Sequence, residues 1–377
     1  MLLAYRPPRA QLCLPCDPQS SDPFPACHPP HPICLAAVAS LDRHARPLGS
    51  LRVSVTDRCN LRCSYCLPEG SQVWLPKTEI ATLEELASLV RAMTLVGTSR
   101  VRITGGEPLL RRNLPTLVGE LAGIPAIQDL SMTSNAVLLP DLARPLRSAG
   151  LGRLTISIDT LQASRYALNT RRDSHAELLA GILAAEEAGF TPLKLNTVVL
   201  RGMNDDELAA ILRFAKERGH QARFIEYMDV GGALDWDPKL VVPQAEILQR
   251  LESDYGPIEA LASGDRAPAN LFALPDGTVF GIIASVTAPF CGACDRARLT
   301  ADGKLFTCLY AADGLDLLTP LRAGAALEEV AALVDNRWRN RDDQGAQDRL
   351  AVPTRGPSAQ ARELRAKPHL GMHTKGG

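Results

Sequence analysis

The stretch TDRCNLRCSYC, residues 56–66, decides the fold, because it places Cys59, Cys63 and Cys66 on one loop after the β-branched run LRVSV (51–55). A closed structural metal site normally takes four protein ligands, so three thiols need an explanation. Three thiolates can hold three corners of a four-iron, four-sulfur (4Fe-4S) cluster and leave one iron open to a substrate or cofactor. The alternative is a zinc site completed by His44 or His175, although neither histidine has the short spacing of zinc modules.

A regular alternation of strand and helix patterns extends from this loop to about residue 228. Amphipathic helical patterns, beginning with TLEELASLVRAMTLVG (82–97), separate the strand-like segments LRVSV, RVRIT (100–104), IQDLSMTSN (127–135), RLTISIDT (153–160), LKLNTVVL (193–200) and ARFIEYMD (222–229). Six βα units in succession predict a parallel sheet with right-handed crossovers. We therefore expect an α/β fold with an open (βα)6 partial TIM-type barrel over residues 41–228.

The other segments have different patterns. Residues 1–40 are rich in proline without an apolar period, which predicts a disordered extension. Residues 229–350 predict a C-terminal domain that caps the barrel, with a strand at TVFGIIASV (278–286) and a helix at AALEEVAALVDNRWRN (325–340). Residues 351–377 predict a flexible tail that ends in Gly376 and Gly377.

Composition narrows the classes of function. A formal net charge of −1 and a pI near 6.7 give no reason to expect nucleic-acid binding. No apolar run approaches the roughly 18 residues of a membrane helix, and the first residues do not have a secretion-signal pattern, so we expect a cytoplasmic protein. In a reducing compartment, grouped cysteines favour metal ligation over disulfides. The ten cysteines form three groups: Cys13, Cys16, Cys27 and Cys34; Cys59, Cys63 and Cys66; Cys291, Cys294 and Cys308.

Unusual residues follow every predicted barrel strand. GGEP (105–108) follows the second strand, and the others end at Thr133, Ser157 with Asp159, Lys194 with Asn196, and Met228. Each alone is more often a turn or cap residue. Because the carboxyl ends of parallel barrel strands meet at one face, the set together predicts a single large site.

The motif CNLRCSYC, the GGEP segment and the six βα units resemble the radical S-adenosylmethionine superfamily. The resemblance implies that Cys59, Cys63 and Cys66 bind a 4Fe-4S cluster whose open iron chelates S-adenosylmethionine. It also implies cleavage of that cofactor to methionine and a 5′-deoxyadenosyl radical. The positions that match cofactor contacts are Tyr65, Gly106, Ser157 and Met228.

A closer resemblance, from about residue 41 to 377, is to the GTP 3′,8-cyclase family, whose members are lyases. The segments that carry it are LDRHARPLGSLRVSVTDRCNLRCSYC, VRITGGEPLLRRN, RFIEYMDVG and FCGACDRARLTADGKLFTCLY. The resemblance implies conversion of GTP to 3′,8-cyclo-7,8-dihydro-GTP, the first step of molybdenum cofactor biosynthesis. It implies a second 4Fe-4S cluster on Cys291, Cys294 and Cys308, with its open iron facing the purine. The matching GTP positions are Arg52, Arg102, Thr133, Lys194, Arg296 and Arg298, and the matching catalytic positions are Arg296, Arg298, Gly376 and Gly377.

The family also implies partners: a flavodoxin- or ferredoxin-like reductant, a downstream cyclic pyranopterin monophosphate synthase, and a homodimer. The Gly376–Gly377 pair is expected to reach into the active site, so residues appended after Gly377 should impair activity. Two features depart from the family. The usual TTNG is TSNA here, Thr133 to Ala136, and the cysteine-bearing extension has no counterpart.

Three alternatives remain at this stage. One is another radical S-adenosylmethionine enzyme with an auxiliary cluster, such as a peptide-modifying enzyme. Another is a zinc- or cluster-based sensor without turnover, which would leave the strand-end residues unexplained. The second triplet alone could also be a zinc ribbon that lacks one ligand.

Overall fold

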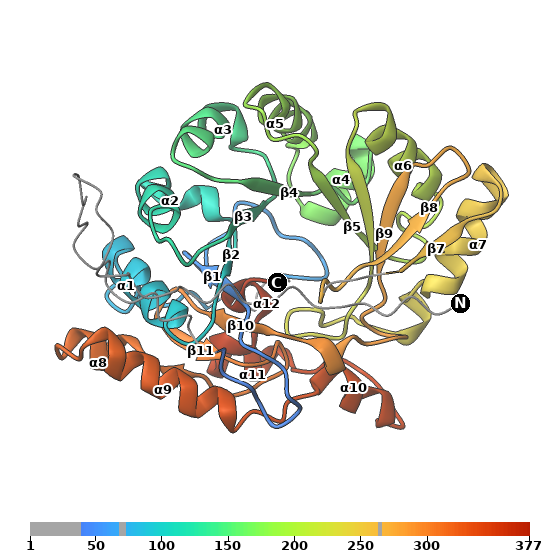
Figure 1. The fold of residues 1–377 in the computed structure, drawn as a ribbon. Coiled ribbons are helices and arrows are strands. Elements are labelled where there is room, and N and C mark those ends of the chain that lie inside the picture. Colours follow the sequence, from blue (N-terminus) through green and yellow to red (C-terminus); the bar gives the residue numbers. More distant parts are fainter. Residues whose placement is uncertain (1–38, 68–72, 263–265) are drawn as a thin grey trace, which may run out of the picture. The chain divides into compact units, whose positions relative to one another are not determined.

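The computed structural model describes residues 39–67, 73–262 and 266–377 (Figure 1). These residues belong to one compact unit, Ala37–Gly377. The predicted disordered extension and its four cysteines lie outside the described residues, except for positions 39 and 40. Within the described residues, no helix is both long and apolar enough to cross a membrane.

Six parallel strands form the predicted barrel wall, each hydrogen-bonded to the next in chain order. They are β1 (Ser50–Ser54), β2 (Arg100–Thr104), β3 (Asp129–Ser134), β4 (Arg153–Ser157), β5 (Lys194–Val199) and β6 (Gln221–Glu226). In β2, Val101 and Ile103 belong to the hydrophobic core, whereas Arg100, Arg102 and Thr104 line an interior cavity. Successive side chains of a strand point to opposite faces, so this alternation produces one apolar and one polar face. The polar face leaves the barrel hollow, where other α/β barrels are filled by branched apolar side chains.

Helices cover the apolar face of the strands, as Figure 1 shows. They are α1 (Leu83–Thr94), α2 (Leu114–Ala122), α3 (Leu139–Ser148), α4 (Ala163–Thr170), α5 (His175–Glu187) and α6 (Leu208–Glu217). Helix α1 begins at a capping box, in which the Thr82 hydroxyl accepts from the Glu85 amide and the Glu85 carboxylate accepts from the Thr82 amide. Helix α4 was not predicted, and its last residues anchor the first cysteine loop.

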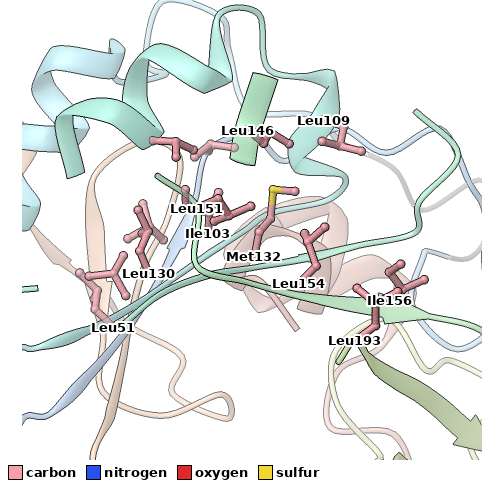
Figure 2. Packing of buried hydrophobic residues seen from close by; sticks show 14 of the residues in the cluster. Leu51, Ile103, Leu109, Leu130, Met132, Leu146, Leu151, Leu154, Ile156 and Leu193 are labelled. Carbon is pink, nitrogen blue, oxygen red and sulfur yellow. The ribbon is translucent and has the colours of Figure 1, made fainter. Parts of the chain in front are cut away.

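The apolar layer between strands and helices is shown in Figure 2. Ile103, Met132 and Leu154 from the strands lie in the same cluster as Leu146 from α3 and Leu109 after β2. All five side chains are at most 5% exposed. This layer fixes the outer face of the sheet, so the inner face and its polar side chains have little freedom to move.

The C-terminal region adds strands to both edges of the same sheet. β9 (Val279–Ile283) pairs with β6, and β10 (Arg296–Leu299) pairs with β1, both in parallel. The antiparallel strands β7 (Glu259–Leu261), β8 (Asn270–Ala273), β11 (Lys304–Phe306) and β12 (Leu315–Asp316) complete a 12-stranded sheet whose end strands, β12 and β7, are not joined. The predicted open α/β barrel is confirmed, and the strand expected at 278–286 is β9.

Further helices lie in this region: α7 (Gln244–Tyr255), α8 (Leu318–Arg322), α9 (Leu327–Arg339) and α10 (Gly345–Asp348). Helix α9 is the helix expected at 325–340, whereas α7 was not predicted. Because β9 and β10 belong to the barrel sheet, residues 229–350 extend the barrel as well as covering it. The division into a barrel and a C-terminal domain stays a prediction.

The prediction of a flexible tail over residues 351–377 is wrong, because this segment is folded against the barrel. It contains α11 (Ala361–Ala366) and α12 (Met372–Lys375). Arg355 forms an ion pair with the buried carboxylate of Asp229 at 2.8 Å. Lys375 is 1% exposed, and its ammonium donates to the carbonyl oxygens of Leu309 and Ala311 at 2.9 and 2.6 Å. Charged side chains that a polar composition predicts to be exposed to solvent are thus bound by distant parts of the chain.

Candidate active site

A cavity of about 800 Å³ occupies the interior of the barrel. The inward faces of β1 to β6 and β10 line it, and both cysteine triplets open onto it. Of the residues proposed from the sequence, all but Gly376 line this cavity: Arg52, Cys59, Cys63, Tyr65, Cys66, Arg102, Gly106, Thr133, Ser157, Lys194, Met228, Cys291, Cys294, Arg296, Arg298, Cys308 and Gly377. The sequence patterns therefore converge in space on one site, whereas their individual roles remain predictions.

The first cysteine loop follows β1 and is anchored to the end of α4. The Arg62 amide donates to the Thr170 carbonyl at 2.9 Å, and the Ser64 hydroxyl donates to the Asn169 side chain at 2.8 Å. The thiols of this loop are free and half-buried. Burial raises the pKa of Cys66 to about 12, so its thiolate needs a positive partner such as an iron centre.

The GGEP segment packs directly against the backbone of the cysteine loop. A Cβ atom added at Gly106 would overlap the carbonyl oxygen of Arg58, and one added at Gly105 would overlap that of Thr56. The amide of Gly106 donates to the Thr56 carbonyl at 2.9 Å. Only a residue without a side chain allows this close approach, so the two glycines form a narrow backbone edge beside the three thiols.

Glu107 joins the ends of three strands and is 1% exposed. Its carboxylate accepts from the Ser134 hydroxyl and the Asn135 amide, both at 2.8 Å, and Asn135 in turn donates to Asn60 in the cysteine loop. Burial raises the pKa of Glu107 to about 7. The turn still forms although the family's TTNG is TSNA here. Ala136 stands where the family has glycine and adopts the left-handed φ of 65° that favours glycine.

Two further polar groups face the same end of the cavity. The Tyr65 hydroxyl donates to the Asp159 carboxylate at 2.6 Å, which orients the tyrosine next to Cys66. Asn196 is paired in register with Ser157, and its buried side-chain oxygen has no hydrogen-bond partner. A buried acceptor without a donor is uncommon in folded proteins, so this oxygen fits a site for a bound ligand. The sequence marked Asn196 as a strand-end residue but assigned it no role.

The second cysteine triplet lies around β10. Cys291 and Cys294 are the ends of a short turn before this strand, and Cys308 follows β11. The Cys294 sulfur accepts from Arg296 at 3.4 Å and from Arg341 at 3.6 Å. Burial alone would raise the pKa of Cys294, but the two arginines outweigh it and lower the pKa to about 6. The structure thus favours a thiolate here, which is the form that binds metal. Arg341 was missed, because it lies 47 residues from Cys294 in the sequence.

Among the described residues, no three Cys, His, Asp or Glu side chains are close enough together to hold a single metal ion. A 4Fe-4S cluster is a larger ligand than one ion. The fit of each triplet to a 4Fe-4S cluster therefore rests on its three free thiols, on their position in the cavity wall and on the groups that surround them.

Three arginines stand side by side on the cavity wall, and we call them the arginine strip: Arg298, Arg52 and Arg102. They occupy equivalent register positions on β10, β1 and β2. Burial, followed by repulsion from Arg298 and Arg102, holds the pKa of Arg52 well below its usual range. Arg102 donates to the hydroxyls of Thr133 and Thr155 at 3.1 and 2.9 Å. Within the described residues, none of the three forms an ion pair with a carboxylate, so the strip is suited to a strongly anionic ligand.

The last residues of the tail reach this strip. The Gly376 carbonyl accepts from Arg298 at 2.6 Å and from Arg52 at 3.2 Å. Figure 1 shows the C-terminus among β1, β10 and α12. Gly376 has a φ of 70°, and a Cβ atom there would overlap the Thr104 methyl group. Both its backbone conformation and its surroundings therefore require glycine.

Two family models match most of the chain. Residues 53–215 match the Radical SAM superfamily, and residues 220–347 match Molybdenum Cofactor Synthesis C. A GTP 3′,8-cyclase 1 of Mycobacterium tuberculosis (strain CDC 1551 / Oshkosh) is 50% identical over 343 residues, which cover 89% of this chain and 95% of the relative. A GTP 3′,8-cyclase of Acidothermus cellulolyticus is 43% identical over 349 residues, again covering 89% and 95%.

Among solved structures, Streptococcus suis SuiB bound to S-adenosylmethionine matches with a TM-score of 0.54 at 14% identity. The match covers 79% of this chain and 78% of SuiB. At this level of identity the likeness shows the fold alone.

Proposed function

This chain belongs to the GTP 3′,8-cyclase family of radical S-adenosylmethionine enzymes, and from this premise we propose how its cavity carries out the reaction. The substrate is GTP, and the product is 3′,8-cyclo-7,8-dihydro-GTP, made in the first step of molybdenum cofactor biosynthesis. The observation that carries the proposal is the pairing of two three-cysteine sites with the arginine strip in one cavity, where Arg298 is buried, Arg52 and Arg102 are half-buried, and none of the three is paired with a carboxylate among the described residues. A metal sensor would have no use for such a strip, and a peptide substrate would not need three cations side by side.

We propose that Cys59, Cys63 and Cys66 hold the cluster that binds S-adenosylmethionine. The Gly106 backbone edge and the unpaired oxygen of Asn196 are placed to contact the cofactor. When bound together, the reduced cluster and S-adenosylmethionine would supply the chemistry that removes a hydrogen atom from the substrate. The chain contributes orientation of the reactants and, once they fill the cavity, the exclusion of water and oxygen.

GTP is proposed to lie between the two cysteine triplets. The arginine strip, Lys194 and the Thr133 hydroxyl hold the triphosphate, because buried arginine and lysine side chains bind phosphate oxygens by charge-assisted hydrogen bonds. The purine faces Cys291, Cys294 and Cys308, which hold the second cluster. This orientation leaves the ribose directed toward the first triplet, where hydrogen is removed from its 3′ position.

The assay that tests this function uses anaerobically reconstituted protein, reductant, S-adenosylmethionine and GTP. We expect 5′-deoxyadenosine to form faster with GTP than with ATP, together with a nucleotide of GTP's mass. Release of 5′-deoxyadenosine at one rate with both nucleotides would favour another radical enzyme. The flavodoxin- or ferredoxin-like donor, the synthase that takes the product, the homodimer and the cytoplasmic location remain predictions.

Two variants, each lacking one cysteine of one triplet, should distinguish the roles of the two clusters. We expect Cys294→Ala to lower iron from about eight to about four per chain while slow cleavage of S-adenosylmethionine without GTP continues. Cys63→Ala should lose a similar amount of iron and all cleavage. Iron analysis with electron paramagnetic resonance of the reduced proteins measures both effects. Unchanged iron in Cys294→Ala would contradict the second site.

GTP binding should weaken above about pH 8. Burial, with repulsion from Arg223, Arg153 and Arg102, lowers the pKa of Lys194 to about 8 in the free protein. Below that pH the ammonium attracts the triphosphate; above it the charge is lost, so the dissociation constant should rise up to about tenfold per pH unit. Lys375 also has a pKa of about 8, so a control is needed. The Lys194→Arg variant stays charged, so its affinity for GTP should change little up to pH 9. An identical loss of affinity in that variant would show that another group causes it.

A further inference from the structure

The turn that carries Cys291 and Cys294 is held at both ends by buried arginines. Arg46 donates to the carbonyl oxygen of Cys291, and Arg341 donates to that of Cys294, each at 2.8 Å. Arg341 also donates to the Cys294 sulfur at 3.6 Å. The side chains of both arginines are at most 2% exposed. Two of the three thiols of the second triplet are therefore positioned by guanidinium groups that the fold has removed from solvent.

The two arginines share one buried carboxylate, that of Asp42. One of its oxygens pairs with Arg46 at 2.6 Å and with Arg341 at 3.1 Å. Its other oxygen accepts from the backbone amides of His44 and Arg46, both at 2.9 Å. Hydrogen bonds to a carboxylate favour its charged form, so Asp42 can hold both guanidinium groups in fixed positions.

Trp338 completes the support of Arg341. The guanidinium carbon of Arg341 lies 4.5 Å from the centroid of the buried tryptophan ring. The indole N–H of Trp338 donates to the Arg46 carbonyl at 3.0 Å, which ties the ring to the other arginine. A guanidinium that is stacked on a ring and paired with a carboxylate has little freedom to rotate. Arg341 therefore presents the same N–H group to the Cys294 sulfur at all times.

An N–H donor fixed in this way acts on the electronic properties of a metal-bound sulfur. Hydrogen bonds to the sulfurs are among the features that set the reduction potential of an iron–sulfur cluster. Reduction adds an electron, and a nearby positive charge stabilises the more negative state. A charged donor to a cysteine ligand should therefore raise the reduction potential of the cluster that the cysteine holds.

We propose that Arg341 is a positioning residue of this kind, a fixed N–H donor to Cys294 that raises the reduction potential of the second cluster. The inference rests on the proposed function, which assigns a 4Fe-4S cluster to Cys291, Cys294 and Cys308. Arg341 acts on that cluster through its cysteine ligand. Its role thus differs from that of Arg296, which also donates to the Cys294 sulfur but is proposed to act on GTP.

The test is a redox titration of the reconstituted protein, followed by electron paramagnetic resonance. Addition of S-adenosylmethionine should change the signal of the first cluster alone, so the two clusters can be followed separately. In Arg341→Gln we expect the ratio of reduced to oxidised second cluster at a fixed ambient potential to fall about tenfold, which is 59 mV for a one-electron couple. The first cluster should titrate as in the wild-type protein.

Arg341→Lys is a second variant, which keeps the positive charge but lacks the fork that reaches both the carbonyl oxygen and the sulfur of Cys294. We expect the ratio to fall about threefold in this variant. It decides the question if Arg341→Gln binds too little iron to be titrated. The control is Arg339→Gln, the same change at a side chain of α9 that is 63% exposed, and it should titrate as the wild-type protein does.

A wild-type ratio in either Arg341 variant with its full iron content would overturn the inference. Loss of the second cluster from both variants would also overturn it, because Arg341 would then be required for cluster binding instead. A wild-type protein that holds only about four irons per chain would overturn the proposed function itself.

Discussion

Gly106→Ala should reduce cleavage of S-adenosylmethionine to about 1% of the wild-type rate or less. The added Cβ atom overlaps the carbonyl oxygen of Arg58 and lies 2.7 Å from that of Asp57, both in the backbone that leads into the cysteine loop. Backbone cannot swing aside as a side chain can, so the loop and its thiols must shift. A displacement of about 1 Å at a reacting centre costs on the order of 100-fold in rate. Release of 5′-deoxyadenosine measures the effect.

Gly119→Ala is the matched control for this change. Gly119 is an exposed residue within α2, and the nearest atom to its added Cβ would be 3.9 Å away. This variant should cleave S-adenosylmethionine normally and gain slightly in stability, because alanine favours a helix over glycine by about 1 kcal/mol. Equal rates in the two variants would show that the close approach at Gly106 has no part in the reaction.

Gly376→Val should lower formation of the cyclised product by about 100-fold while leaving the first cluster and its iron intact. A β-branched residue is strained at a φ of 70°, and its Cβ atom overlaps the Thr104 methyl group. The tail must then leave the strip, so Arg52 and Arg298 lose the carbonyl that orients them. We expect 5′-deoxyadenosine to form without a matching amount of product, which liquid chromatography with mass spectrometry measures.

Gly356→Ala provides the control within the same tail, because no atom lies within 4 Å of the added Cβ. Product and 5′-deoxyadenosine should stay in the wild-type ratio in this variant. If Gly376→Val also kept that ratio, the tail would have no role in positioning GTP. The same reasoning applies to residues appended after Gly377, which lines the cavity.

The barrel and its cysteine loop could be predicted because their signals are local. In RVRIT the alternation of Arg100, Arg102 and Thr104 with Val101 and Ile103 assigns each side chain to one face, and the structure follows it. Applied to every strand, the same alternation would also have marked Asp129, Arg153, Gln221 and Arg223 as cavity residues. The sequence reasoning attended to strand ends and so missed these cavity residues at or near strand beginnings.

The features that were missed depend on contacts between distant segments. β10 is only four residues long, and nothing in RARL indicates that it pairs with β1, about 250 residues earlier. The tail was predicted to be mobile because its composition is polar. Its charged side chains are instead bound by groups that no local pattern reveals: Arg355 pairs with the Asp229 carboxylate, and the Lys375 ammonium donates to two carbonyl oxygens.

We propose that the cavity directs hydrogen abstraction to the ribose of GTP. The most direct measurement supplies GTP deuterated at the ribose 3′ position to the reduced, reconstituted protein and analyses the 5′-deoxyadenosine by mass spectrometry. We expect 5′-deoxyadenosine that carries one deuterium, together with a cyclised nucleotide in equal amount. Unlabelled 5′-deoxyadenosine at the same yield would contradict it, because the hydrogen would then come from another position or another substrate.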